Sequence, residues 1–240
     1  MTALADLACL TTAPETGAPI LTVRRHGYKL LGGAALYDLV DRGKLGRTGE
    51  GRASRVVVLD PSPVPEPSLE YGLARVRGHG EQWPRNAVLR LGGGVKLREG
   101  IYGGLAAEGV LGRRERAGLF SPDRYRVLDV PRRDNIIGHL HAALLEGYEP
   151  HPATRRLAAL LTVGDPHAGP LLDIVLDWPG SGQRLSGSAR STARKHATAS
   201  GMEMAKHDWI ALTTLRAILL PQQIAQASAV FGIADTAIPK

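Results

Sequence analysis

The sequence contains a single cysteine, Cys9, in 240 residues. One cysteine excludes an internal disulfide framework and any metal site built from several thiolates. The chain therefore suits a reducing compartment, and we expect it to be cytoplasmic. Cys9 lies in the apolar stretch 7–10, which predicts a buried structural thiol rather than a reactive one.

Long apolar runs are also missing. A membrane-spanning helix needs roughly 18 uninterrupted apolar residues, but even the apolar segment from Trp209 to Leu220 contains Arg216 and two threonines. The first twenty residues contain Asp6 and Glu15 and lack the basic start and apolar core of a secretory signal. We therefore expect that the chain is not exported and that any membrane contact is peripheral.

Motifs for catalysis, metals and cofactors are absent as well. The Ser-Gly clusters at 180–188 lack the preceding strand and the strong following helix of a hydrolase nucleophile. The glycines at 92–94 lack the strand, the spacing and the Lys-Ser/Thr pair of a phosphate-binding loop. His139 and His141 are two positions apart on a predicted helix and point to different faces, so they cannot form a metal-binding pair. The sequence thus predicts a protein without catalytic residues, metal or cofactor.

The sequence does carry an excess of positive charge. Thirty Lys and Arg residues against 23 Asp and Glu give a net charge of +7 and a pI near 9.8. This balance favours polyanionic partners such as anionic lipid or nucleic acid.

Most of the chain has a helical pattern. Apolar residues recur at helical spacing in 34–42 and 95–108, and Gly43 and Gly109 follow where a helix would end. Asp134 is expected to cap another helix, Pro152 to begin the next, and two more are expected over 206–220 and 222–234. The segment 179–200 is rich in Gly, Ser, Thr and Arg, which predicts a flexible loop or a weak helix.

Two segments have strand character. The β-branched run 55–59 predicts a strand that stops at Asp60-Pro61. Residues 118–120 and 125–128 flank a turn at 121–124 with proline at its second position, so 113–129 is predicted to form a protruding β-hairpin. Together these patterns predict one mostly α-helical globular domain over 1–240 with one or two β-hairpins.

The predicted hairpin and the residues after it are strongly basic. Between positions 113 and 133 there are seven arginines against three acids. Arginine binds phosphate in a bidentate manner, so this surface could meet phosphates; an ordinary solvated face is the alternative. The residues assigned to a membrane-binding or oligomer-forming hairpin are Arg113, Arg114, Arg116, Leu119, Phe120, Arg124 and Arg126, and the other two arginines of the run are Arg132 and Arg133.

Three motifs, in this order, resemble the Golgi phosphoprotein 3 family as it occurs in bacteria. They are LYDLVDRGKL at 36–45, LREGIYGGLAAEGVL at 97–111 with Gly118-Leu119-Phe120 and Tyr125 after it, and RRLAAL at 155–160. The similarity covers residues 4–165 well. It implies a single mostly α-helical domain with an exposed β-hairpin and no catalytic activity. Eukaryotic members bind phosphatidylinositol 4-phosphate, associate peripherally with the Golgi membrane and help to retain glycosyltransferases.

The resemblance also implies a head-group site. The family uses a tryptophan and an arginine near the first motif, where this chain has Val23 and Gly32, and two arginines at the start of the second helix. Arg98 matches one arginine of that second pair, and Val95 stands at the position of the other. The basic residues expected to bind the head group are Arg24, Arg25, Lys29, Lys96 and Arg98.

We therefore expect a non-enzymatic adaptor, peripheral on the inner membrane surface, that binds anionic phospholipid head groups similar to phosphatidylinositol 4-phosphate. A protein client and a homo-oligomer formed through the hairpin are further partners that fit this function. The alternative is a winged-helix-like nucleic-acid-binding module, because a helix followed by an arginine-rich hairpin also fits that motif. Against it, the 95–111 helix has few polar residues that could contact bases. An enzyme without a local motif and a plain interaction scaffold also stay open.

Overall fold

The computed structural model of the protein describes residues 2–18, 20–50, 53–92, 95–113, 124–164, 170–182 and 185–219, with the side chains of 21–26, 95–98 and 170 left out. The elements are α1 (Ala3–Leu10), α2 (Leu21–Asp41), β1 (Leu45–Thr48), β2 (Arg55–Val58), α3 (Pro67–Arg77), α4 (Pro84–Gly92), α5 (Val95–Ala107), α6 (Val130–Leu145), α7 (Pro152–Gly164), α8 (Pro170–Leu176), the 3-10 turn η2 (Pro179–Ser181), α9 (Gly187–Ala205) and a helix over 209–219. The prediction of a mostly α-helical fold with a β-hairpin is confirmed.

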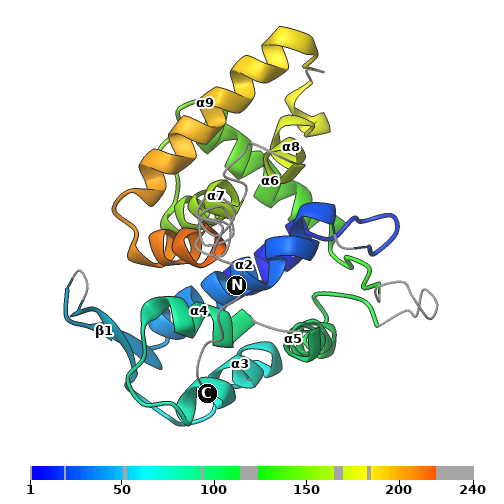
Figure 1. The fold of residues 1–240 in the computed structure, drawn as a ribbon. Helices are drawn as coiled ribbons and strands as arrows, with labels where there is room; N and C mark the ends of the chain where they lie inside the picture. Colours follow the sequence, from blue (N-terminus) through cyan, green and yellow to red (C-terminus); the bar gives the residue numbers. More distant parts are fainter. Residues whose placement is uncertain are drawn as a thin grey trace, which may run out of the picture.

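The long helix α2 runs through the middle of the molecule, with α3, α4 and α5 on one side and α6 to α9 on the other (Figure 1). Every residue from 29 to 39 is buried, and a helix that is buried on all sides must be enclosed by others. One hydrophobic cluster joins residues from α1, α2, β2 and α3 through to the helix over 209–219. Helix α2 therefore organises the core.

Glycines allow the helices around α2 to approach closely. A Cβ atom on Gly92 of α4 would lie 2.8 Å from the Cα atom of Gly32 in α2, and a Cβ atom on Gly32 would collide with the carbonyl oxygen of Val88. A Cβ atom on Gly104 of α5 would lie 2.6 Å from the Cα atom of Ser68 in α3. These contacts are between backbones, which cannot move aside as a side chain can.

The two strands form an antiparallel hairpin in which Leu45 pairs with Val58 and Thr48 pairs with Arg55. The predicted strand at 55–59 is thus confirmed as β2. Its partner β1 lies in a segment for which no strand was predicted from the sequence. Beyond β2, Gln82 forms a further antiparallel bridge with Val56, so the α3–α4 connection lies against the hairpin.

The predicted hairpin over 113–129 falls largely outside the described residues, which omit 114–123. On either side of this gap, Leu111 and Val127 form an antiparallel bridge. The Gly112 amide donates to the Arg126 carbonyl oxygen at 2.7 Å. The chain therefore returns antiparallel to itself at this place. The helix expected over 222–234 also lies outside the described residues.

Two local predictions are wrong. Helix α6 begins at Val130, and the Asp129 side chain caps it by accepting the Arg132 amide at 2.9 Å, whereas the sequence analysis placed the cap at Asp134. Of the two alternatives predicted for 179–200, the flexible loop is wrong from Gly187 onward, where the chain forms helix α9.

Helix α9 forms because tertiary contacts support a sequence with weak periodicity. Ala197, Gly201 and Ala205 recur every four residues and are buried, on the side of α9 that packs against α7. At the other end, Arg190 forms ion pairs with Asp173 and Asp177 of the α8 segment. A stripe of small residues and two ion pairs do not produce the apolar pattern by which a helix is recognised in sequence.

The beginning of α1 is held by a side chain from α2. The Asp38 carboxylate accepts the Ala3 amide at 2.8 Å and the Leu4 amide at 2.9 Å, while the Thr2 hydroxyl accepts the Ala5 amide at 3.1 Å. Burial raises the pKa of Asp38 to about 6, and the two amide donors offset this only in part. Asp38 thus joins the two helices through a buried polar contact.

A pair of neighbouring glycines tests the close packing of α5 on α3. Gly104→Ala places a methyl group against the backbone of Ser68, so we expect the free energy of unfolding to fall by about 1–3 kcal/mol. A Cβ atom on Gly103 meets no described atom within 4 Å, so Gly103→Ala should instead stabilise the helix by about 1 kcal/mol. Urea denaturation of both variants measures the difference, and equal effects would contradict the packing argument.

The raised pKa of Asp38 predicts a pH dependence of stability. The folded state holds the proton more tightly than the unfolded chain, so the contribution of Asp38 to stability is largest below about pH 4. It falls as pH rises through 6. The asparagine side chain of Asp38→Asn does not take up or release a proton in this pH range, so it lacks this pH dependence. The free energy of unfolding of the wild type relative to Asp38→Asn should therefore fall by up to about 3 kcal/mol between pH 4 and pH 7. Urea denaturation across this range measures the change, and a constant difference between the two proteins would disprove it.

Candidate functional site

Helix α2 carries a buried lysine, Lys29, which is one of the five basic residues that the sequence analysis assigned to the head-group site. Only 4% of its surface is exposed. Its ammonium nitrogen lies 5.4 Å from the centre of the Tyr28 ring. Burial, followed by the charge of Arg85, lowers the pKa of Lys29. The environment of Lys29 therefore disfavours its positive charge.

Arg85, the second cation, lies in the first turn of α4, directly after Pro84. Proline suits the first position of a helix because its missing N–H would have no partner there. The Nε atom of Arg85 is buried without a hydrogen-bond partner. The sequence analysis missed Arg85 because none of the three motifs covers α4. One signal in the sequence could have indicated Arg85. It is a basic residue in the first turn of α4, which contains no acidic residue, and the helix dipole disfavours a positive charge there.

Within the part of the chain that the structure describes, no carboxylate forms an ion pair with Lys29 or Arg85. Arginines elsewhere are paired, as shown by the ion pairs Arg42–Glu66, Arg77–Glu70, Arg132–Asp6 and Arg190–Asp177. Two neighbouring like charges that are partly removed from water destabilise one another. A bound anion would offset both the repulsion and the lost hydration. The pair is therefore chemically suited to hold a phosphate or a carboxylate.

The other four predicted basic residues can be placed only by their backbone. Arg24 and Arg25 lie near the start of α2, and Lys96 and Arg98 in the first turn of α5. Helix α5 begins three residues after Gly92, which packs against the Tyr28–Gly32 turn of α2. The fold thus brings the start of α5 close to the segment that carries Lys29. A helix N-terminus also attracts anions through its free amide groups.

The structure explains why the chain has no arginine at position 32, where the resemblance places one. The Gly32 backbone lies against Val88 and Gly92 of α4, and no side chain fits between the two helices. A cation for this place must come from another position, and Lys29, one helical turn earlier on α2, is available. Val23, in place of the family's tryptophan, has no described side chain.

The basic hairpin residues are only partly described. Arg113, Arg124 and Arg126 are exposed, whereas Arg114, Arg116, Leu119 and Phe120 lie outside the described residues. Two later arginines of the same run have structural contacts. Arg132 forms an ion pair with Asp6 at 2.6 Å, and the Arg133 Nε atom donates to the Cys9 carbonyl oxygen at 3.2 Å. These two contacts hold the start of α6 against α1.

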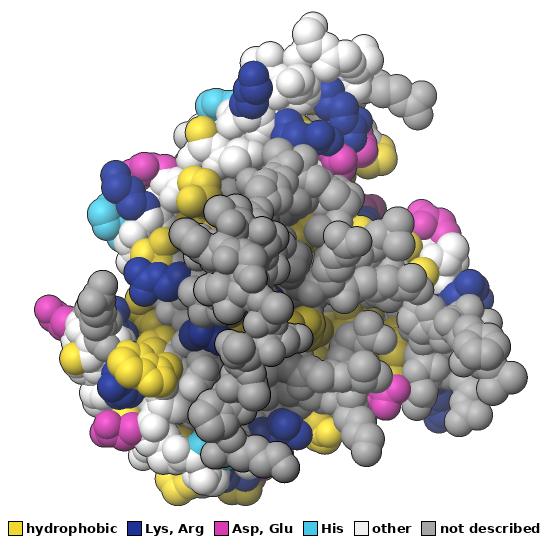
Figure 2. All heavy atoms as spheres, viewed as in Figure 1, with side chains coloured by type: hydrophobic (Ala, Val, Ile, Leu, Met, Phe, Trp, Pro, Cys, Tyr) yellow, Lys and Arg dark blue, Asp and Glu magenta, His cyan; other side chains and the backbone are white. Residues whose placement is uncertain are grey.

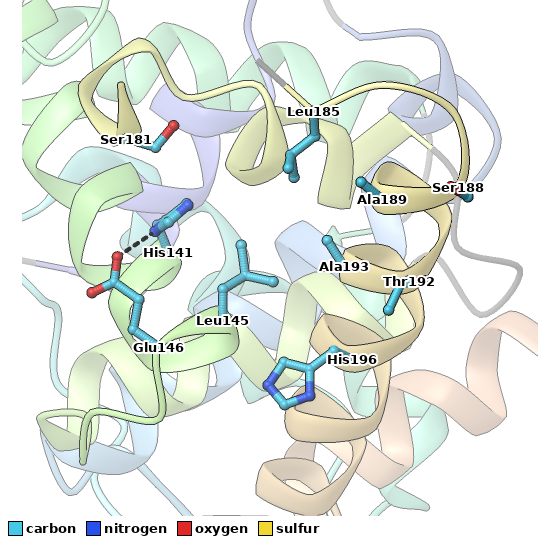
Figure 3. A pocket seen from close by; sticks show the side chains of 10 residues that line it. All are labelled: His141, Leu145, Glu146, Ser181, Leu185, Ser188, Ala189, Thr192, Ala193 and His196. Atoms are coloured by element: carbon cyan, nitrogen blue, oxygen red, sulfur yellow. Dashed lines mark hydrogen bonds and ion pairs between the residues drawn. The ribbon is translucent and has the colours of Figure 1, made fainter. Parts of the chain in front are cut away.

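A hollow of about 680 Å³ lies between α6, the η2 region and the first half of α9 (Figure 3). His141 and Glu146 point toward one another across 3.0 Å from Nδ1 to Oε1, and Leu145 and His196 project from α6 and α9. No described polar atom that lines it is buried without a hydrogen-bond partner. The hollow therefore has no unsatisfied group that would specify a ligand.

Metal-binding, membrane-spanning and thiol sites are a separate question from the cation pair. Among the described residues, no three His, Cys, Asp or Glu side chains come together in a way that could hold a metal ion. No described helix combines the length and the apolar character needed to cross a bilayer. Burial raises the pKa of the Cys9 thiol to about 11, which opposes formation of a reactive thiolate.

The unpaired cations predict that the site reduces stability when it is empty. Lys29→Met keeps an unbranched apolar stem and removes a desolvated charge beside Arg85. In buffer without phosphate or sulfate we expect Tm to rise by about 2–4 °C, equivalent to roughly 1 kcal/mol. Lys195→Met removes the same charge from an exposed position on α9 and should leave Tm unchanged. Calorimetry of the three proteins tests this, and a lower Tm for Lys29→Met alone would contradict it.

Comparisons with known proteins agree with the motifs found in the sequence. A search of curated proteins gives no match. The family model described as Golgi phosphoprotein 3 (GPP34) matches residues 4–212, which extends from α1 into the helix over 209–219. Proteins of that family are Golgi-associated, adaptor-like and non-catalytic. Because the match covers most of its length, the chain belongs to the Golgi phosphoprotein 3 family.

Proposed function

We propose that the protein is a peripheral membrane adaptor that binds anionic phospholipid head groups at Lys29 and Arg85. The observation that carries this proposal is that Lys29 is buried and Arg85 half-buried at the α2–α4 contact, and that neither has a carboxylate partner among the described residues. A desolvated cation pair without acidic partners is costly to keep unless a ligand of opposite charge binds there.

The preferred head group is a phosphate monoester such as that of phosphatidylinositol 4-phosphate. A phosphate monoester carries between one and two negative charges at neutral pH, whereas the phosphodiester of an ordinary phospholipid carries one. Two neighbouring cations therefore match the monoester better. Arg24, Arg25, Lys96 and Arg98 are the further residues that we assign to this site, because their backbones lie in the helices that surround it.

The net charge of +7 supports the same partner. Each basic residue near an anionic membrane surface contributes about 1 kcal/mol of binding free energy. We place the protein on the inner membrane surface facing the cytoplasm, with a protein client as the second partner of the adaptor. Homo-oligomerisation through the 113–129 hairpin belongs to the same proposal.

Vesicle co-sedimentation tests the proposed site. We expect binding that increases from neutral to phosphatidylserine to phosphatidylinositol 4-phosphate vesicles and decreases with salt. Lys29→Met, Arg85→Met and Arg98→Ala should each weaken binding to the phosphoinositide vesicles about tenfold, since a hydrogen bond to a charged group contributes about 1.5 kcal/mol or more. Lys195→Met has the same charge change as Lys29→Met at a distant exposed position and is the control.

Two results would count against the proposal. If Lys195→Met weakens binding as much as Lys29→Met, the protein recognises charge in general and the assigned site is wrong. If the wild type binds no vesicles but retards duplex DNA at moderate salt, the nucleic-acid-binding alternative replaces the adaptor function.

A further inference from the structure

The residues that precede α4 extend the β1–β2 hairpin at the free edge of β2. The Val56 amide donates to the Gln82 carbonyl oxygen at 2.7 Å, and the Gln82 amide donates to the Val56 carbonyl oxygen at 3.0 Å. Residues on either side of this antiparallel bridge come to lie opposite one another. Trp83 is therefore placed across from Arg55, and Arg55 lies across from Thr48.

Trp83 and Arg55 are stacked at this position. The guanidinium carbon of Arg55 lies 3.4 Å from the centre of the Trp83 ring, while 49% of the Trp83 surface stays exposed. A large aromatic side chain that is half exposed loses the hydrophobic stabilisation that burial would give it. Arg55 covers and stabilises one face of the Trp83 ring, and the rest of the ring stays accessible.

Two aliphatic side chains lie beside this stacked pair, one in β2 and one directly after it. Leu59 is 61% exposed and lies above Gly46, where a Cβ atom would be 2.7 Å from a Leu59 methyl group. Val57 is half-buried and shares the alternation of Arg55 and Leu59 along the strand. We call the set Thr48, Arg55, Val57, Leu59 and Trp83 the hairpin face. It combines exposed apolar surface with a stacked cation.

We propose that the hairpin face is an interfacial anchor that enters the head-group layer of an anionic bilayer. Tryptophan favours this layer because its ring is apolar and its N–H is polar, and arginine there can contact lipid phosphates while it stacks on the ring. On the left of Figure 2, beside the region where Figure 1 shows the hairpin, hydrophobic side chains lie among Lys and Arg side chains and a few Asp and Glu side chains.

This inference rests on the proposed function and specifies how the protein would face the membrane. Trp83 precedes Arg85 by two residues, so the anchor continues directly into the cation pair at α4. A head group bound at Lys29 and Arg85 would hold the start of α4 at the membrane. The exposed acid Glu81 neighbours this face, and Glu81→Gln should strengthen binding to anionic vesicles.

Leu59 and Val57 favour a bilayer over nucleic acid. An aromatic ring beside arginine can also stack on unpaired bases. Bases, however, gain little from two aliphatic side chains next to the ring, whereas the acyl boundary of a bilayer accommodates them. The hairpin face thus fits lipid better than a single-stranded oligonucleotide.

Quenching of tryptophan fluorescence by vesicles with brominated acyl chains tests the anchor. The wild type should be quenched on anionic vesicles. Trp83→Phe, which keeps Trp178 and Trp209, should lose most of the quenching while it still binds. Trp83→Ala should reduce vesicle affinity several-fold. Tyr148→Ala, at an aromatic residue that is 67% exposed between α6 and α7, should bind as the wild type does.

The outcomes separate the anchor from the proposed function. Salt-sensitive vesicle binding with equal quenching in the wild type and Trp83→Phe would overturn the anchor and leave the head-group site in place. Absence of vesicle binding by the wild type would overturn both. Stronger Trp83-dependent quenching by a single-stranded oligonucleotide than by anionic vesicles would overturn the choice of lipid as the partner.

Discussion

The structure depends on the close approach of helix backbones at glycines. Gly32 of α2 and Gly92 of α4 meet without side chains between them, and Gly104 brings α5 equally close to α3. At such distances a single methyl group would push two helices apart, because the atoms it meets belong to the backbone. These crossings fix the positions of α4 and α5 relative to α2, on which the remaining helices also pack.

The same crossings determine which residues can form the cation site. Helix α4 occupies the space next to position 32, so the positive charge on α2 comes from Lys29. Arg85 enters from the other helix of the crossing. Neither cation has a carboxylate partner among the described residues, in contrast to Arg42, Arg77 and Arg132, which have one. We expect an unpaired pair of partly desolvated cations to decrease stability when no anion is bound, and the extensive apolar core around α2 offsets that cost.

The contacts of individual cations separate them better than their number along the chain does. The arginine run from 113 to 133 dominates the sequence, yet Arg132 and Arg133 contact α1 and stabilise the fold. Arg85 and Arg55 belong to no basic run. Arg85 differs from the paired arginines because no described carboxylate forms an ion pair with it, and Arg55 stacks on an exposed tryptophan. Local charge density therefore misses both of them.

The sequence by itself determined the fold class, the family and strand β2, because these depend on residue type and local periodicity. Tertiary structure decided the rest. Helix α9 forms where the sequence left a flexible loop or a weak helix open, because its small residues pack on α7. The cap of α6 is Asp129 because only the backbone geometry selects the capping residue. Arg85 joins Lys29 and Trp83 joins Arg55 through helix crossing and strand register, which bring together residues that are far apart in the sequence.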